Sequence, residues 1–280
     1  MTAVEQFGRR CRITVGEEGG TGVLVDEQFR VVFTVQRTIG QEVNSSLVEV
    51  YGLSPDTRKK FLEPNQVCRV EAGYKDNVEV LGIADITRAL VRREPPDIVT
   101  ELQLGDGARA LRDRKVNLSF EAGASVQRVL DRIAQELALG SRATGVQVEG
   151  AYREGVSFSG TAREALNSVT KRAGVVWSIQ NGDLQISDRK LANQGRGVLL
   201  RPNTGLIRSP EPLEDREQET EQRRGAGYRV WCLLNPKIIP GDRLVIESAE
   251  VEGTFRVDSV QHSGDTRGNE WLSEVEVYAE

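Results

Sequence analysis

The chain has 280 residues, which is long enough to bury a large core and to form two or three domains. Its formal net charge of −5 argues against a protein that grips nucleic acid phosphates, because that task needs a concentrated basic surface. Aromatic residues make up only 5% and glycines number 28, so we expect a β-rich chain with many turns and a core of Val, Leu and Ile.

The first hundred or so residues read as a succession of strands. Residues 29–37 place Val31, Phe33 and Val35 on one face, and this period of two is typical of a half-buried strand. Further strands are expected at 46–51, 67–74, 78–83 and 98–104, with a hairpin turn at residues 75–77.

A short helix interrupts these strands. Ser54 is a suitable N-cap and Pro55 fits the first helical position, so we expect a helix that ends near Leu62.

Two amphipathic helices are expected in the middle of the chain. The first follows Ser125, and its apolar positions (126, 129, 130, 133, 134 and 137) share one helical face. The second begins after Thr161, where Glu164 completes a capping-box pattern, and Gly174 is its expected C-cap.

These helices belong to an internal repeat with a period of roughly 38 residues. Strands are expected before them at 117–120 and 155–158, and after them at 145–148 and 175–179. The second unit adds a hairpin that turns at Asn181 and Gly182. We therefore interpret residues 109–190 as a small α+β domain of two strand–helix–strand repeats, without the glycine-rich fingerprint of a nucleotide-binding sheet.

Residues 191–225 are predicted to form a linker that contains a charged loop. Almost no apolar side chain occurs between 213 and 225, so this stretch cannot order itself by burial. A solvated loop is the simpler interpretation. The alternative is an arm that becomes ordered against a partner, and its contact residues would then be Glu214, Asp215, Arg216, Arg223 and Arg224.

Residues 226–280 alternate short apolar runs with turns such as Pro240, Gly241 and Asp242, which is typical of a small antiparallel β-barrel. The strands of residues 1–108 suggest a second barrel. The expected fold class is therefore β-rich α+β, with two tube-like antiparallel β-barrel domains and the α+β domain between them.

Residue types that carry catalysis or bind metals are sparse. The single histidine, His262, adjoins Ser263 and Asp265 in an expected turn, where neighbouring side chains diverge instead of forming a triad. We expect Ser263 and Asp265 to stabilise that turn. No clustered zinc ligands, P-loop or nucleophile elbow occur, so we predict no catalytic, cofactor or metal site.

The cysteines and the N-terminus indicate where the chain folds. Cys11, Cys68 and Cys232 are scattered and odd in number, which argues against a disulfide framework. The first ten residues lack the apolar run of a signal peptide, and no segment approaches the roughly 20 apolar residues that cross a bilayer. We expect a soluble protein made in a cytoplasm.

Three tryptophans and two arginine-rich stretches complete the sequence features. Trp177, Trp231 and Trp271 lie in strand patterns and are expected in the core, the alternative being an interface anchor. Residues 88–93 and 109–115 are interpreted as solvated strand faces, the alternative being contact with nucleic acid.

Two parts of the chain resemble the central baseplate hub proteins of contractile-tailed bacteriophages. Residues 33–37 followed by 44–54 are similar to the opening of many such hubs, with Gly52 where Asn is common. The stretches 233–236, 240–242 and 262–271 are more specific. The resemblance covers most of the chain and extends to the hub part of type VI secretion spike proteins.

The resemblance implies a homotrimer whose six barrels form a pseudo-sixfold ring between a hexameric tail tube and a trimeric spike. The implied partners are copies of the chain, the tube or tube-end protein, the spike and other baseplate proteins. DNA would pass through the channel without specific binding, and the chain would not insert into a membrane. The expected place is the virion tail baseplate, assembled in the bacterial host cytoplasm.

Two alternatives remain open at this point. One is a tail-associated peptidoglycan-degrading enzyme, suggested by the abundant carboxylates. The other is a cell-wall-binding module formed by residues 109–190.

Overall fold

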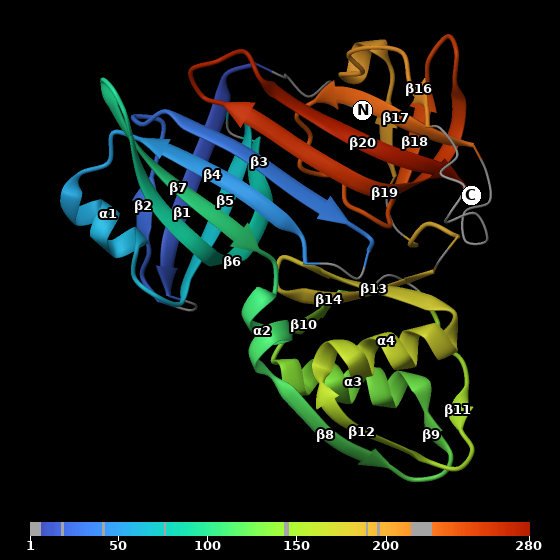
Figure 1. Ribbon diagram of the computed structural model, residues 1–280. Coiled ribbons are helices and arrows are strands. Elements are labelled where there is room, and N and C mark those ends of the chain that lie inside the picture. Colours follow the sequence, from blue (N-terminus) through green and yellow to red (C-terminus); the bar gives the residue numbers. More distant parts are fainter. Residues whose placement is uncertain are drawn as a thin grey trace.

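The computed structural model describes residues 7–17, 20–40, 43–75, 77–142, 146–188, 190–194, 197–213 and 226–280 (Figure 1). It is β-rich with additional helices, which confirms the expected α+β class. Among the described residues, no helix combines the length and the apolar character that crossing a membrane requires.

The N-terminal part folds as a curved antiparallel sheet around one hydrophobic core. Val31, Phe33 and Val35 point into this core and are at most 2% exposed, as their alternation predicted. The elements are β1 (Arg9–Glu17), β2 (Val23–Val25), β3 (Val31–Thr38), β4 (Ser45–Tyr51), α1 (Pro55–Phe61), β5 (Gln66–Tyr74), β6 (Asn77–Glu94) and β7 (Asp97–Gly105).

Local signals in this part are confirmed. The Ser54 hydroxyl accepts the backbone N–H of Thr57 at 3.2 Å, and Pro55 begins α1. Phe61, at the end of α1, is fully buried and anchors the helix to the core. Strands β5 and β6 form the expected hairpin, with Lys75 in the left-handed conformation at its turn.

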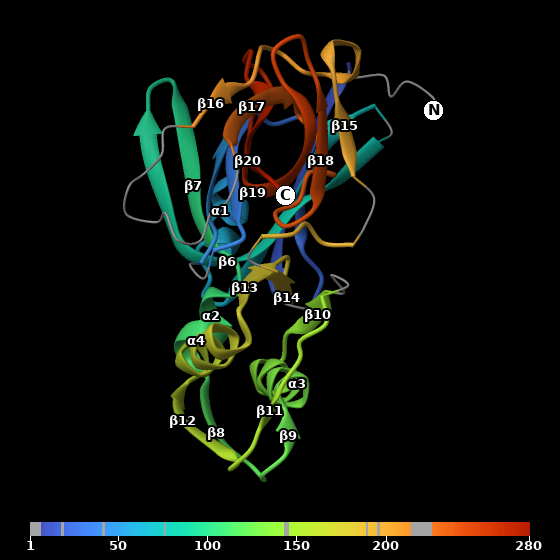
Figure 2. The ribbon, with the colours of Figure 1, turned by 90° about the vertical axis from the view of Figure 1, so that its right-hand side faces the viewer.

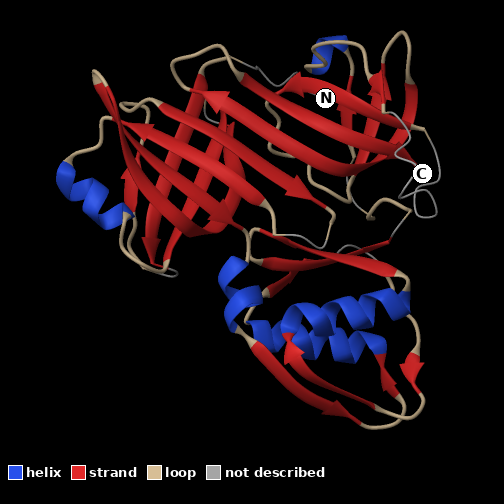
Figure 3. Cartoon of the chain, viewed as in Figure 1, coloured by secondary structure: helices blue, strands red, loops and turns tan. Residues whose placement is uncertain are grey.

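The middle of the chain forms a separate unit with its own core, which we call the α+β unit (residues 108–188). Its two long helices lie between a two-stranded ribbon and a three-stranded sheet (Figure 3). The elements are α2 (Ala108–Asp113), β8 (Lys115–Phe120), β9 (Ala124–Ser125), α3 (Val126–Leu137), β10 (Gly140–Arg142), β11 (Ala151–Tyr152), β12 (Val156–Thr161), α4 (Ala162–Ala173), β13 (Val175–Gln180) and β14 (Asp183–Asp188).

Both long helices begin and end as predicted. Ser125 caps α3 through the N–H of Arg128, and Thr161 and Glu164 form a complete capping box on α4. Gly174 ends α4 with a φ of 73°. The strands that precede the two helices, β8 and β12, pair antiparallel with each other, so the repeat brings its own halves together.

Two predictions in this unit are wrong. Residues 146–148 are not a strand, and residue 145 lies outside the described part. Ala138 adopts the left-handed conformation after α3, so the chain turns at once into β10, which pairs parallel with β14. Residues 109–113, part of the stretch 109–115 expected as a strand face, belong to helix α2, because the chain leaves β7 through Gly107 at a φ of 64°.

The C-terminal part builds a third core beneath strands β17 to β20. Its elements are β15 (Val198–Leu200), a 3-10 turn (Pro202–Thr204), β16 (Glu211–Pro212), β17 (Gly227–Leu233), β18 (Arg243–Glu247), β19 (Glu252–Asp265) and β20 (Trp271–Ala279). His262 and Ser263 lie inside β19 and not in a turn, because β19 pairs with β20 on one side and with β3 on the other.

One sheet joins the N-terminal and C-terminal parts. Strand β3 pairs antiparallel with β19, from Thr38 opposite Ser259 to Val32 opposite Asp265. This pairing creates a continuous layer in the order β16-β17-β20-β19-β3-β4-β7-β6, which we call the eight-strand layer. The ladders among the described residues leave this sheet open, so the two separate closed barrels are not confirmed.

The rest of the large sheet lies on one side of this layer. Strands β5, β1 and β2 continue from the first half of β6, while β18 and β15 continue from β19. In the view turned by 90°, the β6–β7 hairpin stands out on one side of the molecule and β15 and β18 lie on the other (Figure 2). The hydrophobic cores of the N-terminal and C-terminal parts are enclosed between the eight-strand layer and these additional strands.

Candidate functional site: an uncovered sheet face with two free edges

The eight-strand layer has one buried face and one face that no described helix covers (Figure 1). Gln36, Gln261 and Glu274 occupy adjacent positions on β3, β19 and β20 of this uncovered face. Gln36 is exposed and the other two are half-buried, whereas the alternate residues of the same strands point into the cores. The layer therefore presents a broad polar surface across both parts of the chain.

The centre of the uncovered face carries amides and hydroxyls. Thr34, Gln36, Ser259 and Gln261 lie together on the paired strands β3 and β19. None of these side chains ionises near neutral pH. The middle of the layer is therefore without fixed charge and mostly polar, with Leu47 opposite Thr34 as an exposed apolar residue.

Charges lie toward the margins of the face and are largely paired. On β17, Arg229 contacts Glu274 at 3.1 Å and Glu276 at 2.9 Å. At the other side, Arg92 on β6 is ion-paired with Glu49, Glu94 and Glu101. Each arginine is outnumbered by its glutamate partners, so these margins carry a net negative charge.

One margin of the layer is the second half of β6. Its first half pairs with β5, but from Ile86 onward β6 has hydrogen-bonded partners only on β7 among the described residues. Residues 88–94 thus form a free strand edge, which we call the β6 edge. Val91, at 42% exposure, lies on it.

The opposite margin is formed by residues 205–213, which we call the β16 edge. Among the described strands, β16 pairs with β17 alone, and the backbone N–H of Ile207 reaches the carbonyl of Trp231 at 2.9 Å. Ile207 is 50% exposed, and the guanidinium of Arg208 lies 3.3 Å from the ring centre of Trp231. Within the part of the chain that the structure describes, the layer therefore has unpaired backbone at both ends.

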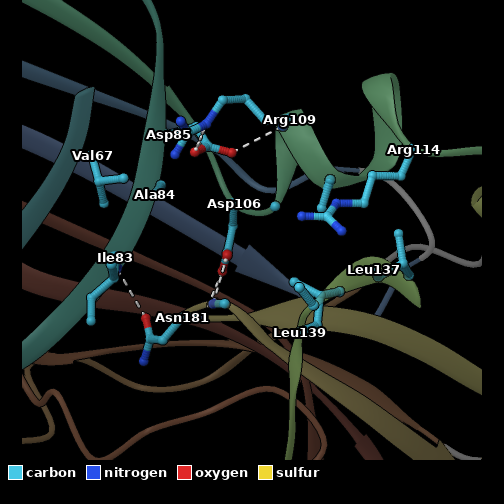
Figure 4. Close-up of a pocket in the computed structure, with 14 residues that line it drawn as sticks. Val67, Ile83, Ala84, Asp85, Asp106, Arg109, Arg114, Leu137, Leu139 and Asn181 are labelled. Carbon is cyan, nitrogen blue, oxygen red and sulfur yellow. Dashed lines mark hydrogen bonds and ion pairs between the residues drawn. The ribbon is translucent and has the colours of Figure 1, made fainter. Parts of the chain in front are cut away.

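The α+β unit is fastened to the layer by the tip of its β13–β14 hairpin (Figure 4). Asn181 and Gly182 both have positive φ, as a tight hairpin turn requires. Their backbone N–H groups donate to the carboxylate of Asp106 at 2.7 and 3.0 Å. The side-chain oxygen of Asn181 accepts the N–H of Ile83 at 3.1 Å, which ties the same turn to β6.

Beside this turn lies a recess of about 380 Å³. Asp85, at the edge of this recess, accepts two hydrogen bonds from Arg109, one from the backbone N–H at 2.9 Å and one from the side-chain Nε–H at 2.5 Å. Helix α2 is therefore also held against β6. Burial raises the pKa of Asp106 to about 6, although its backbone hydrogen bonds act in the opposite direction. Both carboxylates are occupied in holding the unit, which favours a structural role for the recess.

Buried polar contacts continue from this turn to both parts of the sheet. Arg37 donates to Gln180 at 2.9 Å, and Gln180 donates to the carbonyl of Thr38 at 2.8 Å. Gln185 on β14 donates to the carbonyl of Pro240 at 2.8 Å. The hairpin thus bridges the N-terminal and C-terminal parts, and its hydrogen bonds fix where the unit sits.

His262 is buried and does not form a catalytic triad. Its Nδ1 lies 2.8 Å from the Ser273 hydroxyl, and burial together with Arg37 lowers its pKa to about 3. Asp265 points instead to Arg30, with Nη2–Oδ2 at 2.7 Å, and accepts the N–H of Arg267 at 2.9 Å. The turn-stabilising role of Asp265 is confirmed, whereas Ser263 is buried in the strand.

The other predicted site residues have mixed outcomes. Trp177, Trp231 and Trp271 are all buried, as expected for core residues. Residues 88–93 do form a strand of which much is exposed. Within the described ranges, no group of three or more His, Cys, Asp or Glu could hold a metal. The partner-contact residues Glu214, Asp215, Arg216, Arg223 and Arg224 lie outside the described residues and stay a prediction.

Sequence reasoning missed the residues that organise this region. Asp106, Arg37 and Gln180 meet from segments far apart in the sequence, and no local pattern marks them. The sequence predicted a hairpin turn at Asn181 and Gly182, but it did not indicate the hydrogen bonds from this turn to Asp106.

No protein-family model matches the sequence, and no curated protein matches it either. Solved structures do match. The 43 kDa tail protein of prophage MuSo2 from Shewanella oneidensis is 14% identical, with a TM-score of 0.66 over 95% of this chain and 98% of that chain. A tail protein from Neisseria meningitidis is 12% identical, with a TM-score of 0.67 over 98% and 97%.

A third match links the fold to secretion machinery. It is an Escherichia coli component of the type VI secretion system, described as structurally similar to bacteriophage T4 tail proteins. It is 12% identical, with a TM-score of 0.59 over 90% of this chain and 73% of that chain. The chain therefore has the fold of phage tail proteins and of type VI hub proteins, which confirms at the level of fold the resemblance seen in the sequence.

Proposed function

We propose that the chain is a structural tail hub that forms a trimeric ring around a channel. The observation that carries this proposal is the β3–β19 ladder, which joins two parts of the chain into one layer whose two end strands have no further strand partner among the described residues. A monomeric protein usually protects such edges, whereas a ring-former uses them. The similar proteins are described as tail or secretion-system components and not as enzymes, which also supports it.

In this ring the uncovered face of the layer would line the channel. Passing DNA would then meet the amides and hydroxyls of Thr34, Gln36 and Gln261 and few unpaired charges. The arginines Arg92 and Arg229 on this wall are paired with glutamates, so phosphates would find few cations to bind and the nucleic acid would not be retained. The net charge of −5 agrees with this role.

The two parts of the sheet would act as two tube-like modules in each copy. Three copies would then present six modules to a hexameric tail tube and threefold symmetry to a trimeric spike. Three cores support a division close to 1–108, 109–190 and 226–280, although the first core includes Leu234 and Trp271 from the C-terminal part besides residues between 11 and 104. The place of such a hub would be the baseplate of the virion.

The mass of the full chain in solution tests this proposal. Light scattering over a wide concentration range is expected to reveal a species of about three times 30.9 kDa, and electron microscopy of it a ring with threefold symmetry. A chain that stays monomeric at every concentration would count against the proposal. A zymogram on cell-wall material addresses the peptidoglycan alternative, which no described feature favours.

A further inference from the structure

The α+β unit meets the rest of the chain through a polar interface. Among the described residues, its hydrophobic core shares no member with the other two cores, and Val43 alone packs against it from outside the unit. The contacts with the sheet are mainly hydrogen bonds, such as that from Nδ2 of Asn44 to the carbonyl of Ile179 at 2.9 Å. Because water can replace such bonds, a polar interface permits two domains to move relative to each other.

The chain crosses between the sheet and the α+β unit at two places. The first crossing follows β7 at Gly107, whose φ of 64° lies in the left-handed region that glycine adopts without strain. The second follows β14 at Asp188, whose carbonyl accepts Nη1 of Arg256 at 3.2 Å. Two crossings leave the unit tethered to the sheet but able to turn once its hydrogen bonds open.

The recess beside the hairpin turn supplies space for such a movement. Val67, Ile83 and Ala84 line it from the sheet, whereas Leu137 and Leu139 line it from the end of α3 and the residues that follow. About 380 Å³ lies between these walls. The unit can therefore shift on this side without forcing its own core apart.

Asp106 joins the first crossing to the returning hairpin. Its side chain is buried, and its carboxylate accepts the backbone N–H groups of both Asn181 and Gly182. Without this acceptor the docked turn would bury two N–H groups that lack a partner, which is strongly unfavourable. The docked position therefore depends on this carboxylate.

We infer that the α+β unit separates from the sheet as a rigid body, tethered at Gly107 and Asp188, and that the carboxylate of Asp106 is the latch that holds it docked. The movement takes place within one copy, so the inference goes beyond the proposed ring and does not depend on it. Separation would also release the N–H of Ile83, which donates to the side-chain oxygen of Asn181 at 3.1 Å.

Charged groups of both bodies surround the latch carboxylate. From the sheet, Arg37 on β3 and Asp85 on β6 act on it electrostatically. From the unit, Arg109 of α2 is ion-paired with Asp85 and Arg114 lines the recess. Asp183 follows the hairpin turn on β14.

Among these groups and the nearby His262, the latch is the one expected to titrate between pH 5 and pH 7.5. Burial raises the pKa of Asp106 to about 6 when the unit is docked, whereas exposure to water would return it toward 3.8. The pKa of His262 is lowered to about 3, so it stays neutral throughout this range. By linkage, the docked state should be favoured about tenfold more at pH 5 than at pH 7.5.

Hydrogen exchange of individual backbone amides in the full chain, corrected for the intrinsic rate at each pH, tests this inference. The amide of Ile83 is the main reporter, because it contacts the hairpin and not Asp106. It is expected to be protected about tenfold less at pH 7.5 than at pH 5, whereas the amides of α4 keep the same protection. Equal protection of Ile83 at both pH values, or a parallel loss in α4, would overturn the inference.

Matched variants distinguish a latch from general stabilisation. Asp106→Ala removes the acceptor and should lower the protection of the Ile83 amide at least fivefold without changing that of α4. Asp106→Asn cannot titrate, so its Ile83 amide should be protected equally at both pH values. Asp131→Asn, on the exposed side of α3, should retain the pH dependence of the original chain.

Two results with these variants would contradict the inference. If Asp106→Ala left the exchange of Ile83 as in the original chain, the carboxylate would not be the latch. If Asp106→Asn kept the tenfold dependence on pH, another group would control docking. Should Asp106→Ala fail to fold, the pH comparison on the original chain and on Asp106→Asn decides.

Discussion

The carboxylate of Asp106 accepts the backbone N–H of Asn181 at 2.7 Å, which joins two residues 75 positions apart. Asp106 ends the segment that leaves the sheet, and Asn181 turns the hairpin that returns to it. This buried carboxylate is therefore one of the groups that fix how the α+β unit meets the eight-strand layer.

This contact gives stability a definite dependence on pH. Burial raises the pKa of Asp106 from 3.8 to about 6, so the folded chain keeps a proton that the unfolded chain has lost. The free energy of unfolding should therefore fall as pH rises from about 4 to about 6, by up to about 3 kcal/mol from this group.

Urea unfolding at several pH values checks this dependence. The amide of Asp106→Asn cannot titrate. The difference in the free energy of unfolding between the original chain and this variant should therefore change between about pH 4 and about pH 6. Parallel pH curves for the two proteins would show that Asp106 titrates normally.

His262 should act in the opposite direction. Its pKa is lowered from 6.5 to about 3, because burial and Arg37 oppose its charged form. In this pH range the unfolded chain binds a proton at His262 and the folded chain does not. The free energy of unfolding should therefore fall as pH falls from about 6.5 to about 3, by up to about 5 kcal/mol.

His262→Gln is the informative variant, because an amide can still reach the Ser273 hydroxyl. At pH 7 we expect it to cost about 1–2 kcal/mol through altered packing. Below pH 5 this cost should shrink or reverse. If denaturant titrations gave the same difference in the free energy of unfolding between the two proteins from pH 7 to pH 4, the lowered pKa of His262 would be contradicted.

Gly264 allows close packing at the junction of the two parts of the sheet. A Cβ at this position would lie 2.4 Å from Cζ of Phe33 and 2.8 Å from Cε3 of Trp271. Gly264→Ala should therefore lower the free energy of unfolding by about 1–3 kcal/mol through overpacking. In Gly40→Ala, where the Thr38 hydroxyl at 3.3 Å is the one near atom among the described residues, calorimetry should detect a change within about 0.5 kcal/mol.

The two long helices of the α+β unit allow a matched test of capping. Thr161 and Glu164 satisfy each other's backbone N–H groups, whereas Ser125 only accepts the N–H of Arg128. Thr161→Ala should cost about 1–2 kcal/mol and Ser125→Ala about 1 kcal/mol. Thermal melts that rank them in the reverse order would show that the reciprocal bond adds nothing.

The sequence was sufficient wherever a short segment determines its own structure. Ser54, Ser125 and Thr161 cap helices with groups three residues away, and Asn181 with Gly182 makes a turn that few other residue pairs form. Such features need no knowledge of distant partners.

Long-range pairing determined the features that the sequence left open. His262 lies in a strand although its neighbours resemble a turn, because β3, more than 200 residues earlier, pairs with that segment. The same ladder merges the expected two barrels into one open sheet. Burial of Asp106 likewise depends on a hairpin that forms from another part of the chain.

The even number of strands in the layer limits how such a chain could change its length. Gain or loss of one strand would leave the two end strands of the layer running in the same direction instead of opposite directions. Adding or removing a complete hairpin would preserve their opposite directions. If the proposed ring forms through this layer, related chains with a wider or narrower channel should therefore differ by pairs of strands.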